Sequence, residues 1–293
     1  MKHPLIRHTM LILTLCLSGA VAADSCRLTK TIEKRFDADQ FTEVELRALT
    51  GELEVTASDD DQVHFWGRVC TDSQANLDMM DLDILTSDGK LTLIAIIPYH
   101  QENFDPWYAT MDIEFSLPAN LNLRLRDSSG DIHVSDVSVL SIEDSSGDIK
   151  VSNARTDLTI RDSSGRIGVR GVAGKINVTD SSGDIDIREV SGDVEIPGDS
   201  SGDIEISGVS GAVVIDRDSS GDIDIDDVEL DVTIGRDGAG DIKIESVRGA
   251  VSIHSDGSGS VTIDDVGGDL VIRNKGAGDI RTHGISGSID TPG

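Results

Sequence analysis

Residues 127–132, Asp-Ser-Ser-Gly-Asp-Ile, decide the fold because the chain repeats them almost unchanged. The motif Asp-Ser-Ser-Gly begins at residues 127, 144, 162, 180, 199 and 218. Looser versions follow as Asp-Gly-Ala-Gly at 237, Asp-Gly-Ser-Gly at 256 and Lys-Gly-Ala-Gly at 275. Successive units start 17, 18, 18 and then 19 residues apart. Self-similarity at a nearly fixed period indicates a repeat architecture of nine units.

Within each unit the apolar residues alternate, as Ile204 and Ile206 and then Val213 and Ile215 show. A period of two indicates strands, because a helix would space its apolar residues three and four apart. A 19-residue unit is too short for a strand–helix–strand crossover and cannot enclose a core alone. The sequence therefore predicts an all-β fold, a single-stranded parallel β-solenoid (β-helix) of about nine coils of 17–19 residues.

Stacked coils place equivalent residues above one another, so one apolar position per unit should form a continuous buried column. Branched aliphatic side chains suit such a ladder because they are stiff and of matching shape. At the corner, Asp can accept backbone N–H groups ahead of it, Ser packs small, and Gly takes a positive φ. The predicted column is Ile132, Ile149, Ile167, Ile185, Ile204, Ile223, Ile242, Val261 and Ile280.

The N-terminus has the pattern of a secretory signal peptide. Lys2 and Arg7 precede an apolar run at 10–17, and small residues follow at 20–23. The run is far shorter than the roughly 20 residues of a membrane-spanning helix. We therefore expect cleavage after Ala22 or Ala23, export to the periplasm or the cell exterior, and no membrane insertion of the mature chain.

Cys26 and Cys70 are the two cysteines that remain after the signal peptide is removed. An oxidising compartment favours a disulfide between them. A lipid-modified Cys26 is the alternative.

All nine aromatic residues and all three cysteines precede Asp127. Segments 52–56, 62–69 and 90–97 still alternate like strands, whereas 99–110 has the pattern of a loop. We therefore divide the chain into a signal peptide (1–23), a β-rich N-terminal cap section (24–126) and a parallel β-solenoid (127–293). A cap is expected because a solenoid end exposes apolar core and unpaired strand edges. The other end shows no comparable cap, so end-to-end self-association of the rods is a further expectation.

The junction of the two parts resembles a known family. Residues 112–121, Asp-Ile-Glu-Phe-Ser-Leu-Pro-Ala-Asn-Leu, lead into Leu-Arg-Leu-Arg-Asp-Ser-Ser-Gly-Asp-Ile at 123–132. This pattern resembles the "putative adhesin" domain family of unknown function in bacterial envelope proteins, in which a strand ending in Leu-Pro leads into repeated Ser-Gly-Asp-Ile units. The resemblance covers most of the mature chain. It implies an exported, adhesin-like β-solenoid and supplies no catalytic motif.

The formal net charge of −29 argues against nucleic acid and anionic lipid as partners, and it makes cations the natural small ligands. Two Asp residues flank each corner, so stacking should gather carboxylates in columns along the outside of the rod. One interpretation is an ordered Ca²⁺ site; the competing one is solvated turn residues with diffuse counterions. The candidate ligands are Asp127, Asp131, Asp144, Asp148, Asp180, Asp184, Asp199, Asp203, Asp218 and Asp222.

A catalytic role for the corner serines is disfavoured because Gly-Ala replaces Ser-Ser in two units, and His133, His254 and His283 occupy different repeat positions. A glycan-active enzyme would need an aromatic platform, for which Phe104, Trp107 and Tyr108 are the candidates. Packing within the cap is the competing role for these three residues.

The sequence therefore favours a noncatalytic, exported, adhesin-like β-solenoid. We expect its acidic, repetitive surface to contact an envelope protein or glycan. The alternatives are a glycan-active β-helix enzyme and a Ca²⁺-stabilised structural scaffold.

Overall fold

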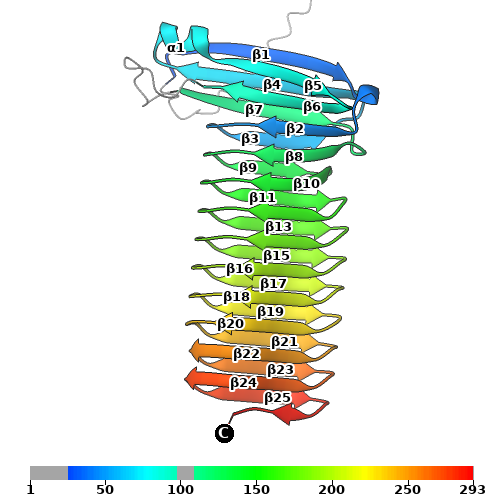
Figure 1. Ribbon diagram of the computed structural model, residues 1–293, viewed down its shortest axis with the longest axis vertical. Coiled ribbons are helices and arrows are strands. Elements are labelled where there is room, and N and C mark those ends of the chain that lie inside the picture. The colour runs from blue at the N-terminus through cyan, green and yellow to red at the C-terminus, as the bar shows by residue number, and fades with distance from the viewer. Residues whose placement is uncertain (1–25, 98–108, 293) are drawn as a thin grey trace, which may run out of the picture.

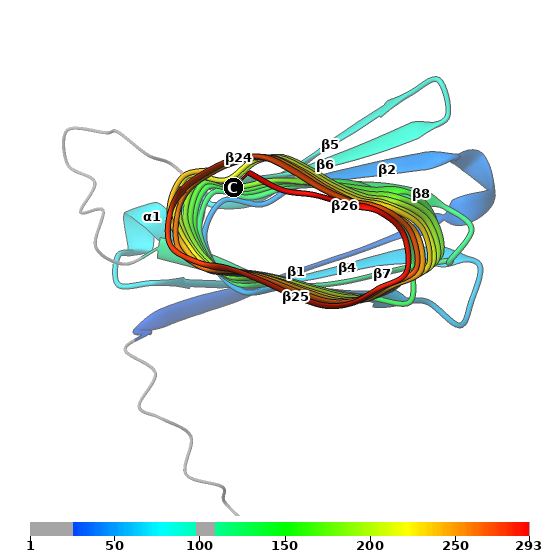
Figure 2. The same cartoon turned by 90° about the horizontal axis from the view of Figure 1, so that it is seen from below.

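The computed structural model describes residues 26–97 and 109–292. These residues form a long rod of stacked parallel coils beneath a wider N-terminal cap (Figure 1). Seen along the rod, the coils enclose a flattened oval whose two broad walls are β-sheets (Figure 2). The parallel β-solenoid predicted from the repeat is confirmed. The predicted signal peptide lies outside the described residues.

Each wall is a sheet of 13 strands, called here sheet A and sheet B. In spatial order, sheet A contains β1 (Leu28–Asp37), β4 (Gln62–Thr71), β7 (Ala109–Leu117), β3 (Leu53–Ala57), β9 (Ile132–Ser135), β11 (Ile149–Ala154), β13 (Ile167–Val172), β15 (Ile185–Val190), β17 (Ile204–Val209), β19 (Ile223–Val228), β21 (Ile242–Val247), β23 (Val261–Val266) and β25 (Ile280–Ile285). Sheet B contains β5 (Asp81–Ser87), β6 (Lys90–Ile96), β2 (Glu43–Arg47), β8 (Asn122–Arg126), β10 (Ser138–Glu143), β12 (Leu158–Arg161), β14 (Ile176–Thr179), β16 (Val194–Gly198), β18 (Val213–Arg217), β20 (Val232–Asp237), β22 (Val251–Ser258), β24 (Leu270–Ala277) and β26 (Ile289–Asp290).

The core is a set of aliphatic columns between the two sheets. Ile204 pairs in register with Ile185 on one side and Ile223 on the other, and the same register holds along the predicted column. Its members from Ile132 to Val261 are at most 1% exposed, and Ile280 in the last coil is partly buried. Burying one such side chain contributes about 1.5–3 kcal/mol, and no coil could bury its residues without its neighbours.

The corner glycines have two structural roles. Gly130 to Gly278 at the motif position all have positive φ, as expected for the corner. In addition, a Cβ built on Gly202 would lie 2.0 Å from the carbonyl oxygen of Gly183 in the preceding coil. The distance between coils therefore leaves no room for any side chain at this position.

The cap section begins with a coil that the repeat pattern does not reveal. Strands β2 and β3 pair in parallel with β8 and β9, with Leu46 opposite Leu125 and Leu53 opposite Ile132. Beyond this coil, sheet A continues through β7, β4 and β1, of which β4 and β1 run antiparallel to their neighbours. Sheet B continues through β6 to the antiparallel β5. These strands cover the end of the core, as Figure 1 shows.

Among its described residues the cap also contains two short helices, the 3-10 turn Ala38–Gln40 and α1 (Gln74–Met79). Within the described ranges, neither helix has the length and apolarity needed to cross a membrane.

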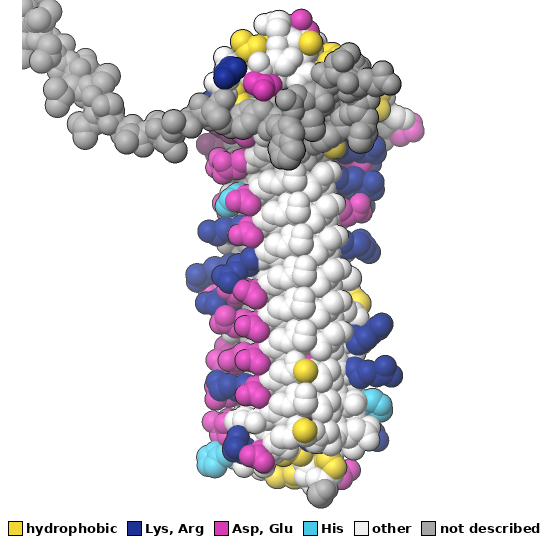
Figure 3. Space-filling view, turned by 90° about the vertical axis from the view of Figure 1, so that its left-hand side faces the viewer, with side chains coloured by type: hydrophobic (Ala, Val, Ile, Leu, Met, Phe, Trp, Pro, Cys, Tyr) yellow, Lys and Arg dark blue, Asp and Glu magenta, His cyan; other side chains and the backbone are white. Residues whose placement is uncertain are grey.

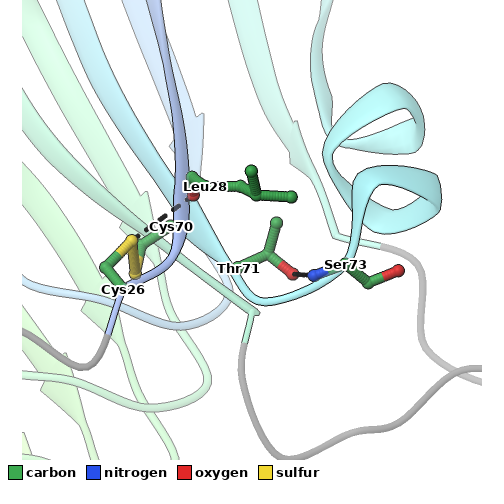
Figure 4. Close-up of a disulfide and its surroundings, with 5 residues drawn as sticks. All are labelled: Cys26, Leu28, Cys70, Thr71 and Ser73. Atoms are coloured by element: carbon green, nitrogen blue, oxygen red, sulfur yellow. Dashed lines mark hydrogen bonds between the residues drawn. A yellow bond between two sulfur atoms is a disulfide. The ribbon is translucent and has the colours of Figure 1, made fainter.

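A disulfide joins Cys26 to Cys70, with their Cα atoms 5.5 Å apart (Figure 4). It links the residues before β1 to the end of β4, across 44 residues of sequence. A cross-link of this kind stabilises the fold mainly by restricting the unfolded chain.

The glycine column provides a direct test of the stacking. We expect Gly202→Ala to lower the free energy of unfolding by more than about 3 kcal/mol, because the new Cβ meets backbone and φ is +131°. Gly198→Ala is the matched control, since a Cβ there has no atom within 4 Å, and its effect should stay within about 0.5 kcal/mol. Urea unfolding measures both. Equal effects would show that the corner does not set the coil spacing.

Candidate functional site

The first Asp of each corner lies inside the rod. Leu123, Leu125 and Asp127 alternate inward along one strand and into the corner, and the same holds in later coils. The prediction that both corner carboxylates line the outside is therefore wrong for this position. We call these eight residues the buried Asp column, and each is only 2–7% exposed. Its members are Asp127, Asp144, Asp162, Asp180, Asp199, Asp218, Asp237 and Asp256.

Each buried Asp begins a tight turn. In Asp144, Asp162, Asp180 and Asp199, Oδ1 accepts the backbone N–H of the following Ser at 2.7 Å, as expected for a turn-forming Asp. The Oδ2 atoms of these four residues have no hydrogen-bond donor among the described residues. Burial raises the pKa of Asp180 to about 6, and the neighbouring Asp162 and Asp199 add to the effect.

The two ends of the column differ from its middle. Ala48 precedes Asp127 in the stack, where its N–H bonds to the Arg126 carbonyl oxygen. At the other end Lys275 pairs in register with Asp256. Its Nζ lies 2.7 Å from Asp256 Oδ2, and the two side chains are 4% and 0% exposed. The Lys that replaces Asp in the ninth motif is therefore a buried counterion for the last carboxylate.

The second Asp of each corner lies at the surface. Its Oδ1 accepts the backbone N–H of the equivalent residue in the next coil, for example Asp203 from Asp222 at 2.9 Å and Asp222 from Asp241 at 2.8 Å. Asp184 likewise accepts the backbone N–H of Asp203. This hydrogen bond and the Arg166 guanidinium together lower the pKa of Asp184. The members of this exposed Asp column are Asp131, Asp148, Asp184, Asp203, Asp222 and Asp241.

The candidate calcium ligands are thus split between two columns. Five of the ten belong to the buried Asp column and five to the exposed one. Across residues 26–97 and 109–292, no group of three or more His, Cys, Asp or Glu is arranged to hold a metal ion. Asp162, Asp237 and Asp256 were not singled out from the sequence, although they occupy the same motif position as the five buried candidates.

The corner serines have a structural role where their bonds are defined. The hydroxyls of Ser146, Ser164, Ser182 and Ser220 each donate to a backbone carbonyl oxygen of the preceding coil, at 3.1–3.2 Å. These bonds tie adjacent corners together. Figure 3 shows this narrow side of the rod as an uncharged central band, with acidic and basic groups together along one border and mainly Lys or Arg groups along the other.

The broad outer face of sheet A carries a groove over β9 to β15. Its volume is about 530 Å³, and Gly168 leaves its floor open because no side chain projects there. Basic and acidic groups line it together, including His133, Lys150, Arg166, Arg170, Arg188, Asp131, Asp148 and Asp186.

The cations of the groove differ in their partners. Arg170 bonds to Glu189 at 2.6 Å, and Arg188 bonds to Asp186 at 2.7 Å and Glu205 at 2.9 Å. Arg166 bonds to Asp184 at 2.6 Å. Lys150 is exposed and forms no ion pair with another described residue. It is therefore the cation of the groove that a ligand can engage without breaking an existing pair.

The same face continues into the cap with a smaller hollow of about 220 Å³. Trp66 and His64 of β4 line it, together with Glu54 and Glu114. Trp66 is partly exposed, and the alternation of β4 could have placed it on this outer face. Phe104, Trp107 and Tyr108, the aromatic candidates predicted from the sequence, lie outside the described residues.

The fold and surface define a repeat protein of the parallel β-solenoid class. Residues 30–207, more than half of the chain, match the family described as Toastrack DUF4097. The chain therefore belongs to this family of unknown function, and the family resemblance drawn from the sequence is confirmed.

The chain is also similar to several solved structures, all at low sequence identity. A "putative adhesin" from Bacteroides fragilis is 15% identical, with 90% of this chain and 97% of that chain covered and a TM-score of 0.39. A "putative cell adhesion protein" from Clostridium sporogenes is 10% identical, with 87% and 99% covered and a TM-score of 0.37. A "putative lipid binding protein" from Parabacteroides distasonis is 16% identical, with 90% and 97% covered and a TM-score of 0.31. No curated protein matches the chain.

The exposed Asp column should act through its backbone hydrogen bonds. We expect Asp222→Ala to lower the free energy of unfolding by about 1 kcal/mol, because the Asp241 N–H loses its acceptor. Asp226→Ala in the same coil removes an equal charge from an exposed site and should change stability by less than about 0.5 kcal/mol. Thermal unfolding of the two variants at one pH makes the comparison. A larger loss for Asp226→Ala would contradict this role.

Proposed function

We propose that the protein is a noncatalytic, exported, adhesin-like β-solenoid that contacts a protein or glycan of the bacterial cell envelope. The observation that carries the proposal is the outer face of sheet A, a long rigid surface on which charged side chains repeat once per coil. Membership of the Toastrack family and relatives described as putative adhesins support it. The expected signal peptide supports export.

The balance of charge on this face changes along the rod. The groove end carries Lys150, Arg170 and Arg188 beside Asp131, Asp148 and Asp186. The strands beyond it carry mainly acids, Glu205, Asp224, Asp226, Glu245 and Asp264. Each exposed charge contributes little alone, but a partner with regularly spaced groups engages many at once. Such a surface favours an extended or repetitive partner over a small molecule.

The groove and the hollow beside Trp66 are the most selective parts of this face. The partly exposed indole offers an apolar surface with a polar edge, which suits a sugar ring or a protein side chain. Lys150 offers an unpaired cation to an anionic group of the partner. We therefore place the first contact at the cap end of sheet A, with the acidic strands extending it.

The contact face can be tested by charge reversal at two equivalent positions. Lys150 and Lys243 both follow the first Ile of their strands and point outward, but only Lys150 lines the groove. We expect Lys150→Glu to weaken retention of envelope components on the immobilised mature protein about five-fold or more, the equivalent of about 1 kcal/mol. Lys243→Glu should leave retention within about two-fold of the wild type.

Protease treatment and periodate oxidation of the envelope fraction decide between a protein and a glycan as the retained partner. Retention of nothing at any salt concentration would contradict the proposed function. Equal losses of retention for Lys150→Glu and Lys243→Glu would show that the contact is not centred on the groove. Turnover of a polysaccharide by the wild-type protein would contradict the noncatalytic assignment.

Export has its own measurement. We expect the intact mass of protein recovered from the producing bacterium to correspond to a chain beginning at Ala23 or Asp24, because the signal peptide is removed after the small residues. The mass should also show two hydrogens fewer than the reduced chain, which reports the Cys26–Cys70 disulfide. A full-length cytoplasmic chain with free thiols would contradict export.

A further inference from the structure

The buried Asp column is the least ordinary feature of the interior. Eight carboxyl groups in eight successive coils are at most 7% exposed. Among the described residues, Lys275 is the one cation paired with them inside the rod, and Asp256 is the one member of the column with which it pairs. An ionised carboxylate without a partner is very costly to bury, so such groups normally become neutral or acquire a counterion.

The stacking brings the carboxyl groups of adjacent coils together. Asp237 and Asp256 pair in register, as do Asp256 and Lys275. The Asp237 side chain lies within hydrogen-bonding reach of both Asp218 and Asp256. Among the described residues, Lys275 is the one side-chain donor to the carboxyl oxygens of these three residues, and it reaches only Asp256 of the three. One proton placed between two such groups converts a repulsion into a strong O–H···O⁻ bond.

We infer that the buried Asp column takes up protons from the solvent when the chain folds, and that protons shared between adjacent coils make the solenoid an acid-stabilised rod. Each proton binds one Oδ2 atom and is donated to a carboxylate oxygen of a neighbouring coil. Lys275 ends the column because its ammonium group supplies the positive charge that a proton supplies elsewhere.

The other charged groups near the buried Asp column do not neutralise its carboxylates. On its solvent side a shallow depression is lined by Arg126 and Arg161, but also by Glu143. The exposed Asp131, Asp148 and Asp203 raise the pKa of buried members through like charge. On the inner side the column borders aliphatic strand residues such as Leu125. Burial and like charge therefore favour protonation of the column, whereas the solvent-side arginines and the backbone N–H groups of the following serines favour its ionised form.

The pKa values of the buried carboxyl groups agree with their burial and stacking. Burial, assisted by Asp144, raises the pKa of Asp127 from 3.8 to about 7. Burial, assisted by Asp218 and Asp256, raises the pKa of Asp237 to about 7. Between about pH 4 and about pH 7 the folded chain therefore binds more protons than the unfolded chain, whose aspartates keep their ordinary value. Stability gained from the column is complete below that window and is lost as the pH rises through it.

The test compares thermal midpoints of the whole mature protein at about pH 5 and about pH 8, which lie below and above the raised pKa values of Asp127 and Asp237. We expect the wild-type midpoint to be higher at the lower pH by at least about 5 °C. General charge repulsion in so acidic a chain acts in the same direction. Variants that remove one charge from each column separate the two effects.

Asp180→Asn keeps an acceptor for the Ser181 N–H and carries N–H groups where the proton would lie. We expect it to raise the midpoint at about pH 8 and to leave it nearly unchanged at about pH 5. Asp184→Asn removes an equal charge four residues later, from a carboxylate whose pKa is lowered by hydrogen bonds. It should give no gain at either pH. Lys275→Met should lower the midpoint, because the buried Asp256 carboxyl group then loses its counterion.

Three results would overturn the inference. The first is a wild-type midpoint that is equal at the two pH values or higher at about pH 8. The second is equal gains from Asp180→Asn and Asp184→Asn, which would assign the effect to overall charge. The third is a rise in the midpoint at the higher pH on adding Ca²⁺, reversed by a chelator and lost in Asp180→Asn, because cations would then neutralise the column in place of protons. None of these measurements depends on an envelope partner, so they stand or fall separately from the proposed function.

Discussion

Backbone hydrogen bonding between coils fixes their separation at about 4.8 Å, and this separation decides which side chain each position can hold. Every residue in the rod meets its own equivalent in the coils on either side. Branched aliphatic residues gain from this arrangement, because each packs against a copy of its own shape. The motif glycine position has no room for any side chain, since a Cβ on Gly147 would lie 2.0 Å from the Gly130 carbonyl oxygen. The aliphatic columns and the glycine column both follow from that one distance.

The same coil spacing is unfavourable for charged residues, because it stacks like charges close together. The neighbouring groups then decide whether the pKa of a buried acid is raised or lowered. For Glu45, burial alone would raise the pKa, but hydrogen bonds from Arg47 and Lys90, each 2.6 Å long, lower it to about 2. Asp180 is similarly hidden from solvent but has carboxylates as stacking neighbours, and its pKa is raised to about 6. The pKa values of these two buried acids move in opposite directions because Glu45 is hydrogen-bonded to cations, whereas Asp180 has other carboxyl groups as its stacking neighbours.

The sequence predicted those features that depend on a repeated local pattern. Alternating Ile and Val residues gave the strands and the register, and the motif glycines gave the corners. The inward direction of the first Asp was missed, although the alternation Leu123, Leu125, Asp127 contains it, because an acidic residue next to Ser and Gly resembles an exposed turn. The coil built from β2 and β3 was missed because Ala-Leu-Thr-Gly at 48–51 replaces the motif at its corner.

A second column of left-handed residues could not be predicted from composition. Asn153, Glu189, Asp227, Ser246 and Asp265 have φ between 55° and 60°, at equivalent places where sheet A bends. Glycine occupies the same place in other coils, as at Gly171 and Gly208. Glu and Ser rarely adopt this conformation, so only the neighbouring coils dictate it. The groove likewise depends on which outward residues happen to be neighbours, with Gly168 between Lys150 and Asp186.

The coil formed by β2 and β3 also bears on the order in which the molecule can assemble. Leu46 and its partner Leu125 are 79 positions apart, whereas Ile204 and Ile223 are 19 apart. Closing the longer loop costs more entropy before any contact forms, so neighbouring repeats can nucleate and propagate more readily than the cap. During synthesis from the N-terminus, β2 and β3 are therefore made first but cannot complete their coil until β8 and β9 have been synthesised and can pair with them.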